Sequence, residues 1–465
     1  MRRWVLPLVL GAVCLAAGLL AVAPRGDPGV APAPAVLAPV LSARRVPAVM
    51  AQVVADQRLR SVLDATLADP ALGAARGKSC LVVRQGSRAI VVRRADFALI
   101  PASTLKVLTA QAVVARIGAE ERFVTEARTA VPVAADGTVA GDLWVVGGGD
   151  PLLATADYAA SFPNQPQVIT PFERLADTLV EAGVRVVGGA VIGDESRYDT
   201  QRYLPTWKPS YREDGDVGPS SALAVNDGFV TLPPRPVAAE QPAIHTAGVL
   251  TTLLQARGVR VGGAPGRGVA PAGSVVVAAL PSPPVGVIVA QMLRESDNVT
   301  AESLTKELGY RFEGTGTTAA GVRVIRQTVA DAGVEIDGLA SVDGSGLDRS
   351  DRATCASLLA SLGSSGPEGV VAAGFPVAAR DGTLAMRFVG HPAAGRLRAK
   401  TGSLSGVAGL AGFVDPATPG VPLSFALLAN ELPRDSLGRR LQEDLAAALA
   451  RYPDAPPLDS LGPRR

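Results

Sequence analysis

Two residues three positions apart, Ser103 and Lys106, open a helical pattern in this chain. Leucines at 105 and 108 follow at helical spacing, so we expect Ser103 near the start of a helix. Free N–H groups and the positive end of the helix dipole favour developing negative charge there. Lys106 lies on the same helical face. A hydroxyl with an amine one turn away can supply a nucleophile and a base.

The Ser-x-x-Lys pattern alone is weak. Ser103 is also a good helix N-cap, and Lys106 could lie on a solvated face. A second match, Ser303 to Lys306, lies inside a helical run and needs no catalytic explanation. The chain has only five lysines, and its other basic residues are arginines. Because lysine can lose its proton when desolvated and arginine cannot, this usage favours Lys106 as a base.

Two later fragments strengthen this hypothesis. Ser296-Asp297-Asn298 follows a helical run, and Lys400-Thr401-Gly402 lies in a predicted hairpin. Separately, the first could be a helix cap and the second an ordinary strand end. In this order, the three fragments are the signature of penicillin-binding proteins and class A β-lactamases. The combination is therefore far more specific than any one part.

The chemistry of such a set is acyl transfer. Ser103 would attack a carbonyl, and neutral Lys106 would take its proton, with a nearby Lys400 cation lowering the Lys106 pKa. Ser296 would relay a proton to the leaving amine, and Asn298 would orient Lys106 and the substrate amide.

Substrate contacts are expected along the third fragment. Lys400 and Thr401 would meet a substrate carboxylate, with Gly402 between them and Ser403. The N–H groups of Ser103 and Ser403 would form an oxyanion hole. This chemistry requires no metal and no cofactor.

Spacing and further segments carry a family resemblance. About 190 residues separate Ser103 from Ser296, which leaves room for an inserted domain. Other segments that look like family segments are 143–151, 221–227, 343–347, 381–384 and 393–396. The chain resembles the D-alanyl-D-alanine carboxypeptidase/endopeptidase family of low-molecular-mass, class C penicillin-binding proteins over about residues 50–450. The resemblance implies cleavage of terminal D-Ala from peptidoglycan stem peptides, often cleavage of cross-links, and acylation by penicillin and other β-lactams.

The expected fold class is α/β (α+β), an antiparallel sheet flanked by helices as in penicillin-binding proteins and serine β-lactamases, with a smaller α/β insert. We predict a catalytic domain from residues 48–121 and 282–452 and an insert over 122–281. An Ala/Pro-rich linker covers 25–47, and a Pro-rich tail, 453–465, is expected to be disordered. The insert is short for a family member with two inserted subdomains, which favours carboxypeptidase over endopeptidase activity.

The N-terminus predicts export. Residues 1–24 combine a short basic start with an apolar run, which fits either a signal peptide or a single N-terminal membrane anchor. The expected location is therefore extracytoplasmic. Cys80 and Cys355 follow this segment. A disulfide and two buried free thiols both remain open.

Composition excludes other functions. The formal net charge is +2, and no basic block or aromatic–basic alternation indicates a nucleic-acid partner. Only two histidines are present, at 245 and 391. This number argues against both a zinc site and a Ser-His-Asp triad.

One further residue is a candidate for substrate binding. Asp199 follows an expected strand of the insert and could pair with a free amine of the stem peptide; the alternative is a solvated loop carboxylate. Two other functions also remain open, a β-lactamase or esterase on the same fold, and a catalytically weak wall-binding protein. Fast loss of a penicillin label would favour the first, and absence of any label the second.

Overall fold

The computed structural model describes residues 46–231 and 236–461. The predicted signal or anchor and nearly all of the predicted linker lie outside these residues. Within them, no helix is both long and apolar enough to span a membrane. Residues 453–461 belong to the segment predicted to be disordered. There the structure differs, because Ser460 donates two hydrogen bonds to the Pro457 carbonyl and a short 3-10 helix forms at Leu458–Leu461.

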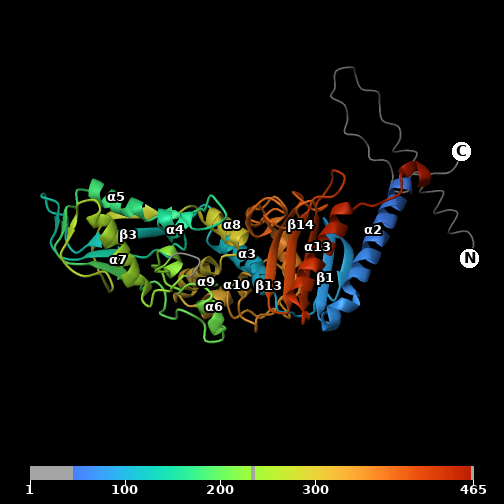
Figure 1. Ribbon diagram of the computed structural model, residues 1–465, viewed down its shortest axis with the longest axis horizontal. Helices are drawn as coiled ribbons and strands as arrows, with labels where there is room; N and C mark the ends of the chain where they lie inside the picture. The colour runs from blue at the N-terminus through green and yellow to red at the C-terminus, as the bar shows by residue number, and fades with distance from the viewer. Residues whose placement is uncertain (1–45, 232–235, 462–465) are drawn as a thin grey trace, which may run out of the picture. The chain divides into compact units, whose positions relative to one another are not determined.

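A five-stranded antiparallel sheet organises the catalytic part, in the order β13-β14-β15-β1-β2. Its strands are β1 (Ser79–Gln85), β2 (Arg88–Arg93), β13 (Leu397–Leu404), β14 (Val407–Val414) and β15 (Leu423–Asn430). Strands from the two ends of the sequence thus lie side by side, and Figure 1 shows blue β1 beside the orange strands. The sheet and its flanking helices confirm the predicted fold class.

Both faces of this sheet are covered by helices. Alternation with period two sends Leu410 and Leu427 to one face and Ala411 and Leu428 to the other. The first face packs on α2 (Val46–Leu67) and α13 (Asp435–Arg451). The second face packs on a helical layer that contains α3 (Lys106–Arg116), α8 (Val285–Glu295), α9 (Asn298–Glu313), α10 (Thr318–Asp331), α11 (Cys355–Ser365) and α12 (Val370–Ala373).

Helix α3 lies at the centre of this layer. Val107, Leu108 and Val113 are fully buried against α8, α9, α10 and α11. Such a helix is apolar on nearly every side because it has neighbours on every side. The first residue of α3 is Lys106, so its side chain starts inside the protein.

Residues 124–281 form a second part with its own core. One sheet has the order β11-β9-β5-β3-β12 and another the order β10-β8-β4, and residues from both contribute to one cluster of buried side chains. The larger sheet contains β3 (Val124–Thr129), β5 (Leu143–Val146), β9 (Val191–Asp194), β11 (Gly266–Arg267) and β12 (Val275–Pro281). The smaller sheet contains β4 (Thr138–Val139), β8 (Val186–Val187) and β10 (Arg260–Val261). This part, which we call the insert, therefore has a mixed α/β arrangement and a core of its own.

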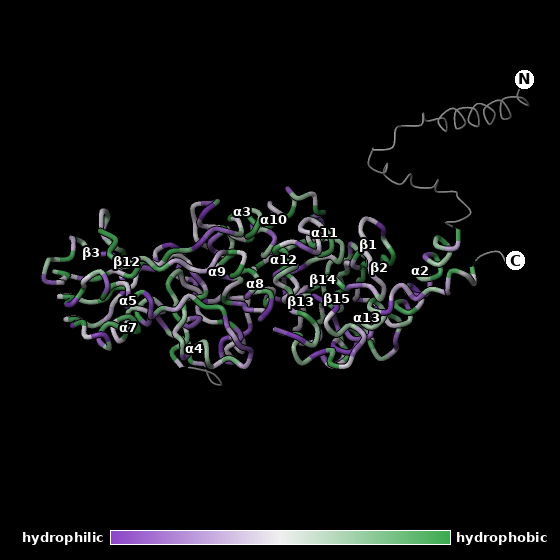
Figure 2. The backbone as a smooth tube through the Cα atoms, turned by 90° about the horizontal axis from the view of Figure 1, so that it is seen from above, coloured by the Kyte–Doolittle hydropathy of each residue, from purple (hydrophilic) through white to green (hydrophobic). Residues whose placement is uncertain are grey.

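Helices α5 (Glu173–Glu181) and α7 (Pro242–Gln255) cover the larger sheet of the insert. A connecting region carries β6 (Leu153–Ala154), α4 (Ala156–Ala160), β7 (Thr170–Pro171) and α6 (Pro209–Glu213). The views from the side (Figure 1) and from above (Figure 2) both place α8, α9 and α10 between the sheet of β3 and the sheet of β13 and β14. The helical layer therefore lies between the two sheets.

A disulfide joins Cys80 on β1 to Cys355 on α11, across a sequence separation of 275 residues. Both cysteines are fully buried in the core between the sheet and the helical layer. The structure thus decides in favour of the bridge over two free thiols. A cross-link that closes a long loop restricts the unfolded chain.

We therefore expect the double variant Cys80→Ala/Cys355→Ala to lower the free energy of unfolding by about 2–4 kcal/mol. Urea denaturation of the variant and the native protein measures this difference. As a control, a reductant should destabilise the native protein and leave the variant unchanged. Equal unfolding midpoints for the oxidised native protein and the variant would contradict the expectation.

Candidate active site

Ser103 lies in a 3-10 turn, η2 (Ala102–Leu105), that leads directly into α3. Asn430, at the end of β15, holds the preceding backbone, because its side chain accepts from the Ile100 N–H at 2.8 Å and donates to the Ile100 carbonyl at 3.0 Å. Ala102 adopts a positive φ of 48° at the bend. Ser103 is only half-buried at this bend. The expected helix start is confirmed, with a 3-10 turn as its first part.

Lys106 is fully buried, and its Nζ makes three hydrogen bonds. It lies 3.1 Å from Ser103 Oγ, 2.6 Å from Asn298 Oδ1 and 2.7 Å from the Ser345 carbonyl oxygen. Burial lowers the pKa of Lys106 to about 8, against the charges of Asp343 and Asp297, which raise it. The amine is therefore close to the nucleophile and partly neutral near physiological pH.

The cause of this pKa shift differs from the sequence-based expectation. The expectation was that the Lys400 charge lowers the Lys106 pKa, whereas loss of water is the dominant cause. The repulsion between the two lysine charges instead affects the pKa of Lys400. Burial lowers the pKa of Lys400 well below its usual value, and the Lys106 charge lowers it further.

Ser296 and Asn298 lie at the junction of α8 and α9. Ser296 ends α8 with a left-handed backbone (φ 63°), and Asn298 is the first residue of α9. Between them, Asp297 caps α9 by accepting from the Val299 N–H at 2.8 Å. The cap interpretation therefore holds for Asp297, while its two neighbours face the lysines.

Lys400 is buried on the edge strand β13. Its Nζ donates to Ser296 Oγ at 2.8 Å and to the Thr401 carbonyl at 2.9 Å. Strand β13 lies directly against the Ser103 turn, since a Cβ on Gly402 would stand 2.7 Å from the Pro101 carbonyl oxygen. Only glycine allows this approach. Ser403 is exposed beyond Gly402, and its oxyanion role stays a prediction.

The structure thus brings Ser103, Lys106 and Asn298 into one hydrogen-bonded group and Ser296 with Lys400 into a second. It separates the other Ser-x-x-Lys pair from both. Ser303 is buried inside α9, and Lys306 Nζ donates to Asp199 Oδ1 at 2.6 Å. The structure does not bring Asp199 to Ser103, and its carboxylate already has a cation. A role for Asp199 in substrate binding stays a prediction.

Sequence reasoning assigned no role in the site to the turn that carries Ser345. Asp343 Oδ1 accepts from the Gly346 N–H at 2.7 Å, and its Oδ2 accepts from Trp207 Nε1 of the insert at 2.9 Å. Glu302, on α9, accepts from two further N–H groups of the turn. The sequence predicted a turn at 343–346 and a family resemblance over 343–347, but no contact with Lys106. No local pattern in the sequence indicated that its backbone would bind Lys106.

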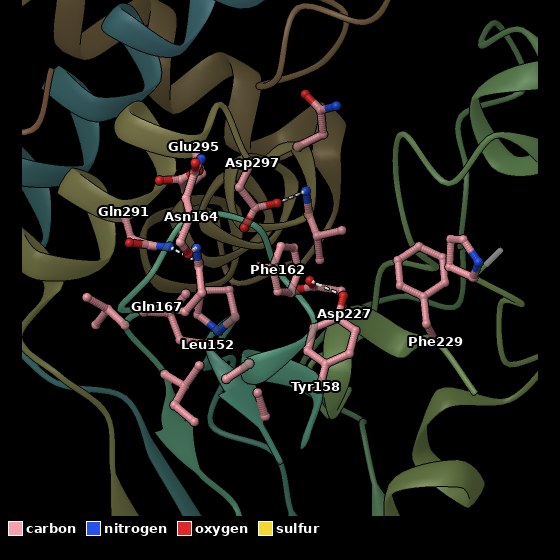
Figure 3. Close-up of a pocket in the computed structure, with 18 of the residues that line it drawn as sticks. Leu152, Tyr158, Phe162, Asn164, Gln167, Asp227, Phe229, Gln291, Glu295 and Asp297 are labelled. Atoms are coloured by element: carbon pink, nitrogen blue, oxygen red, sulfur yellow. Dashed lines mark hydrogen bonds between the residues drawn. The ribbon is translucent and has the colours of Figure 1, made fainter. Parts of the chain in front are cut away.

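The insert also borders this site. Asn298 Nδ2 donates to the Asp216 carbonyl at 2.7 Å, so an insert loop uses the amide that was predicted to face substrate. Next to Ser296 and Asn298 lies a cavity of about 410 Å³ (Figure 3). Among the described residues, its lining contains no lysine, arginine or histidine. It includes aromatic rings and four carboxylates: Tyr158, Phe162, Phe229, Asp216, Asp227, Glu295 and Asp297.

Within the described residues, the carboxylates of this cavity form no salt bridge, although some have hydrogen-bond partners. Tyr158 donates to Asp227 at 2.7 Å, and Asn164 donates to Glu295 at 2.8 Å. Burial, and then the charge of Asp297, raise the pKa of Asp227 to about 8. A carboxyl with this pKa largely keeps its proton at neutral pH, so Asp227 adds little negative charge to the cavity.

Comparison with known proteins agrees with this geometry. A model of the D-Ala-D-Ala carboxypeptidase 3 (S13) family matches residues 59–240 and 232–452. A D-alanyl-D-alanine carboxypeptidase of Actinomadura sp. is 28% identical over 440 residues, covering 78% of this chain and 79% of the relative. A carboxypeptidase of Mycobacterium tuberculosis is 31% identical over 368 residues, covering 76% of each.

A solved structure has the same fold. Penicillin binding protein 4 of Haemophilus influenzae superposes with a TM-score of 0.69 at 19% identity, covering 80% of this chain and 96% of that one. The family match spans most of the chain, including both lysine-containing groups of the site. The chain therefore belongs to the D-Ala-D-Ala carboxypeptidase (S13) family of serine-type hydrolases.

Proposed function

We propose that this protein removes the terminal D-Ala from peptidoglycan stem peptides through an acyl-enzyme on Ser103. One observation carries this proposal. The amine of Lys106 is fully buried, and its pKa is lowered to about 8. It lies 3.1 Å from Ser103 Oγ, and Ser103 is partly exposed to solvent. Family membership supplies the substrate class, and the geometry supplies the nucleophile and the base.

Acylation begins when Ser103 Oγ attacks the carbonyl carbon of the penultimate D-Ala. Neutral Lys106 takes the Oγ proton, and its hydrogen bonds to Asn298 and Ser345 fix the direction of the amine. The C–N bond then breaks, and the departing D-Ala nitrogen receives a proton from Ser296, which regains one from protonated Lys106 and so returns Lys106 to its neutral form. Hydrolysis repeats these steps with water as the nucleophile, and Ser103 Oγ leaves with a proton.

Lys400 has two tasks in this scheme. Its hydrogen bond to Ser296 orients the hydroxyl that carries the proton. Its charge, together with Thr401, attracts the terminal carboxylate of the substrate. Because a nearby anion favours the charged form of an amine, a bound carboxylate would offset the burial that lowers the Lys400 pKa. Backbone N–H groups of Ser103 and Ser403 are proposed to bind the oxyanion.

The proposal extends to ligands and location. β-Lactams carry a strained amide and a carboxylate that match the same groups, so we infer acylation of Ser103 by penicillin. Cleavage of cross-linked peptides would follow the same steps with a different leaving amine. Such substrates are extracytoplasmic, in keeping with the buried disulfide and the predicted export signal or anchor.

Ser103→Ala should abolish covalent labelling by fluorescent penicillin, because the acylated oxygen is absent. The fold should be retained, since a half-exposed hydroxyl contributes little to stability. Labelling followed by mapping of the modified peptide measures this. Ser303→Ala is the matched control and should label normally. Labelling lost in Ser303→Ala but kept in Ser103→Ala would refute the assignment.

Lys106→Arg should slow penicillin acylation at least about a hundredfold, because arginine keeps the charge but cannot accept a proton. The acylation rate is measured by rapid quench, with the folded fraction checked by circular dichroism. Lys306→Arg serves as a control for arginine at a buried lysine site. A near-normal rate in Lys106→Arg would exclude Lys106 as the base.

Acylation should also depend on pH with a definite sign. Because only neutral Lys106 accepts a proton, the rate should rise through about pH 8 and level off above it. Penicillin acylation measured from about pH 6 to about pH 10 gives this profile. A rate that stays flat across this range, or falls through about pH 8, would contradict neutral Lys106 as the base.

A further inference from the structure

The Ser345 carbonyl holds Lys106, and a single carboxylate holds Ser345. Glu302 Oε1 accepts from the Gly344 N–H at 3.0 Å and from the Ser345 N–H at 2.8 Å. The carbonyl of Ser345 then accepts from Lys106 Nζ at 2.7 Å. One peptide turn therefore connects Glu302 to the amine beside the nucleophile.

The turn is fixed on its other sides as well. Thr109 Oγ1, on α3, donates to the Gly344 carbonyl at 2.7 Å. A Cβ on Gly344 would stand 1.8 Å from Thr305 Oγ1, so the backbone lies directly on α9. Gly346 has a φ of 82°, and its backbone approaches the Ala102 carbonyl next to Ser103. A shift of this turn would move Lys106 relative to Ser103.

We propose that Glu302 is a positioning residue for Lys106, because it fixes the Ser345 carbonyl that directs the amine toward Ser103. This inference rests on the proposed acyl-enzyme on Ser103. Glu302 lies one helical turn beyond Asn298 on α9, so the same helix supplies two supports for the amine. Asn298 holds the amine directly, and Glu302 holds it through the turn.

The charge of Glu302 adds a second effect. Burial, and then the charge of Asp343, raise the pKa of Glu302 to about 8. Its Oε2 is buried and makes no hydrogen bond within the described residues. The other charged groups around Glu302 and Lys106 are Asp297, Asp343, Asp351, Lys400 and Lys306. Lys306 already forms an ion pair with Asp199. An ionised Glu302 keeps the proton on Lys106 and so raises the Lys106 pKa.

Two substitutions separate position from charge. Glu302→Gln keeps an oxygen for the two N–H groups but removes the charge. We expect its plateau acylation rate to stay within about threefold and the midpoint of its pH profile to fall. Glu302→Ala removes the support. We expect its plateau rate to fall about a hundredfold, as for a displaced catalytic group, with an unchanged KM for a D-Ala-D-Ala peptide.

Controls keep the two proposals separate. Glu307→Gln removes another buried carboxylate of α9, which pairs with Arg197 and Arg311, and should leave the pH profile unchanged. If Glu302→Ala does not fold, Thr109→Val loosens the turn from α3 and should lower the plateau rate at constant KM. A native rate and pH profile in the folded Glu302 variants, or in Thr109→Val, would overturn the inference while labelling of Ser103 remained. Loss of labelling at Ser103 itself would refute the proposed function instead.

Discussion

The removal of water from the Lys106 amine is the constraint on which the rest of this site depends. An ammonium group in water keeps its proton well above neutral pH, and burial without a paired carboxylate weakens that preference. Within the described part of the chain, no carboxylate forms an ion pair with the amine, and its three partners are a hydroxyl, an amide oxygen and a backbone carbonyl. Neutral acceptors satisfy its hydrogen bonds without fixing its charge. The carboxylates of Asp297 and Asp343 lie near enough to moderate the effect but not to cancel it.

The helical layer provides this environment, and the sheet brings the second lysine to it. Helix α3 is surrounded by other helices, so a residue at its first position can be buried and still reach a bend of the chain. Strand β13 is an edge strand, and Gly402 lets its backbone lie against the Ser103 turn. Lys400 therefore enters from the sheet, while Ser296 and Asn298 enter from the α8–α9 junction.

Much of this arrangement could be predicted from the sequence, because some of its determinants are local. Helix periodicity placed Ser103 and Lys106 at a helix start, and the segment of Lys400-Thr401-Gly402 was predicted to lie in a hairpin, which β13 and β14 form. The remaining supports are contacts between distant segments. Asn430 acts on Ile100, and Glu302 acts on a turn more than 40 positions away. Nothing in the local sequence around Glu302 distinguishes a buried carboxylate from a solvated one.

The contacts of the insert with the site also join distant segments, so the sequence could not predict them. The two ends of the insert meet where Ser282 donates to the Phe123 carbonyl at 2.8 Å, so the catalytic part can carry it without separating α3 from α8. From there the chain returns to the site at two points, the Trp207 side chain on Asp343 and the Asp216 carbonyl on Asn298. Each contact acts on a group that supports Lys106 directly or through the 343–346 turn. The insert is thus physically part of the proposed catalytic group, because the residues that orient Lys106 take some of their own hydrogen bonds from it.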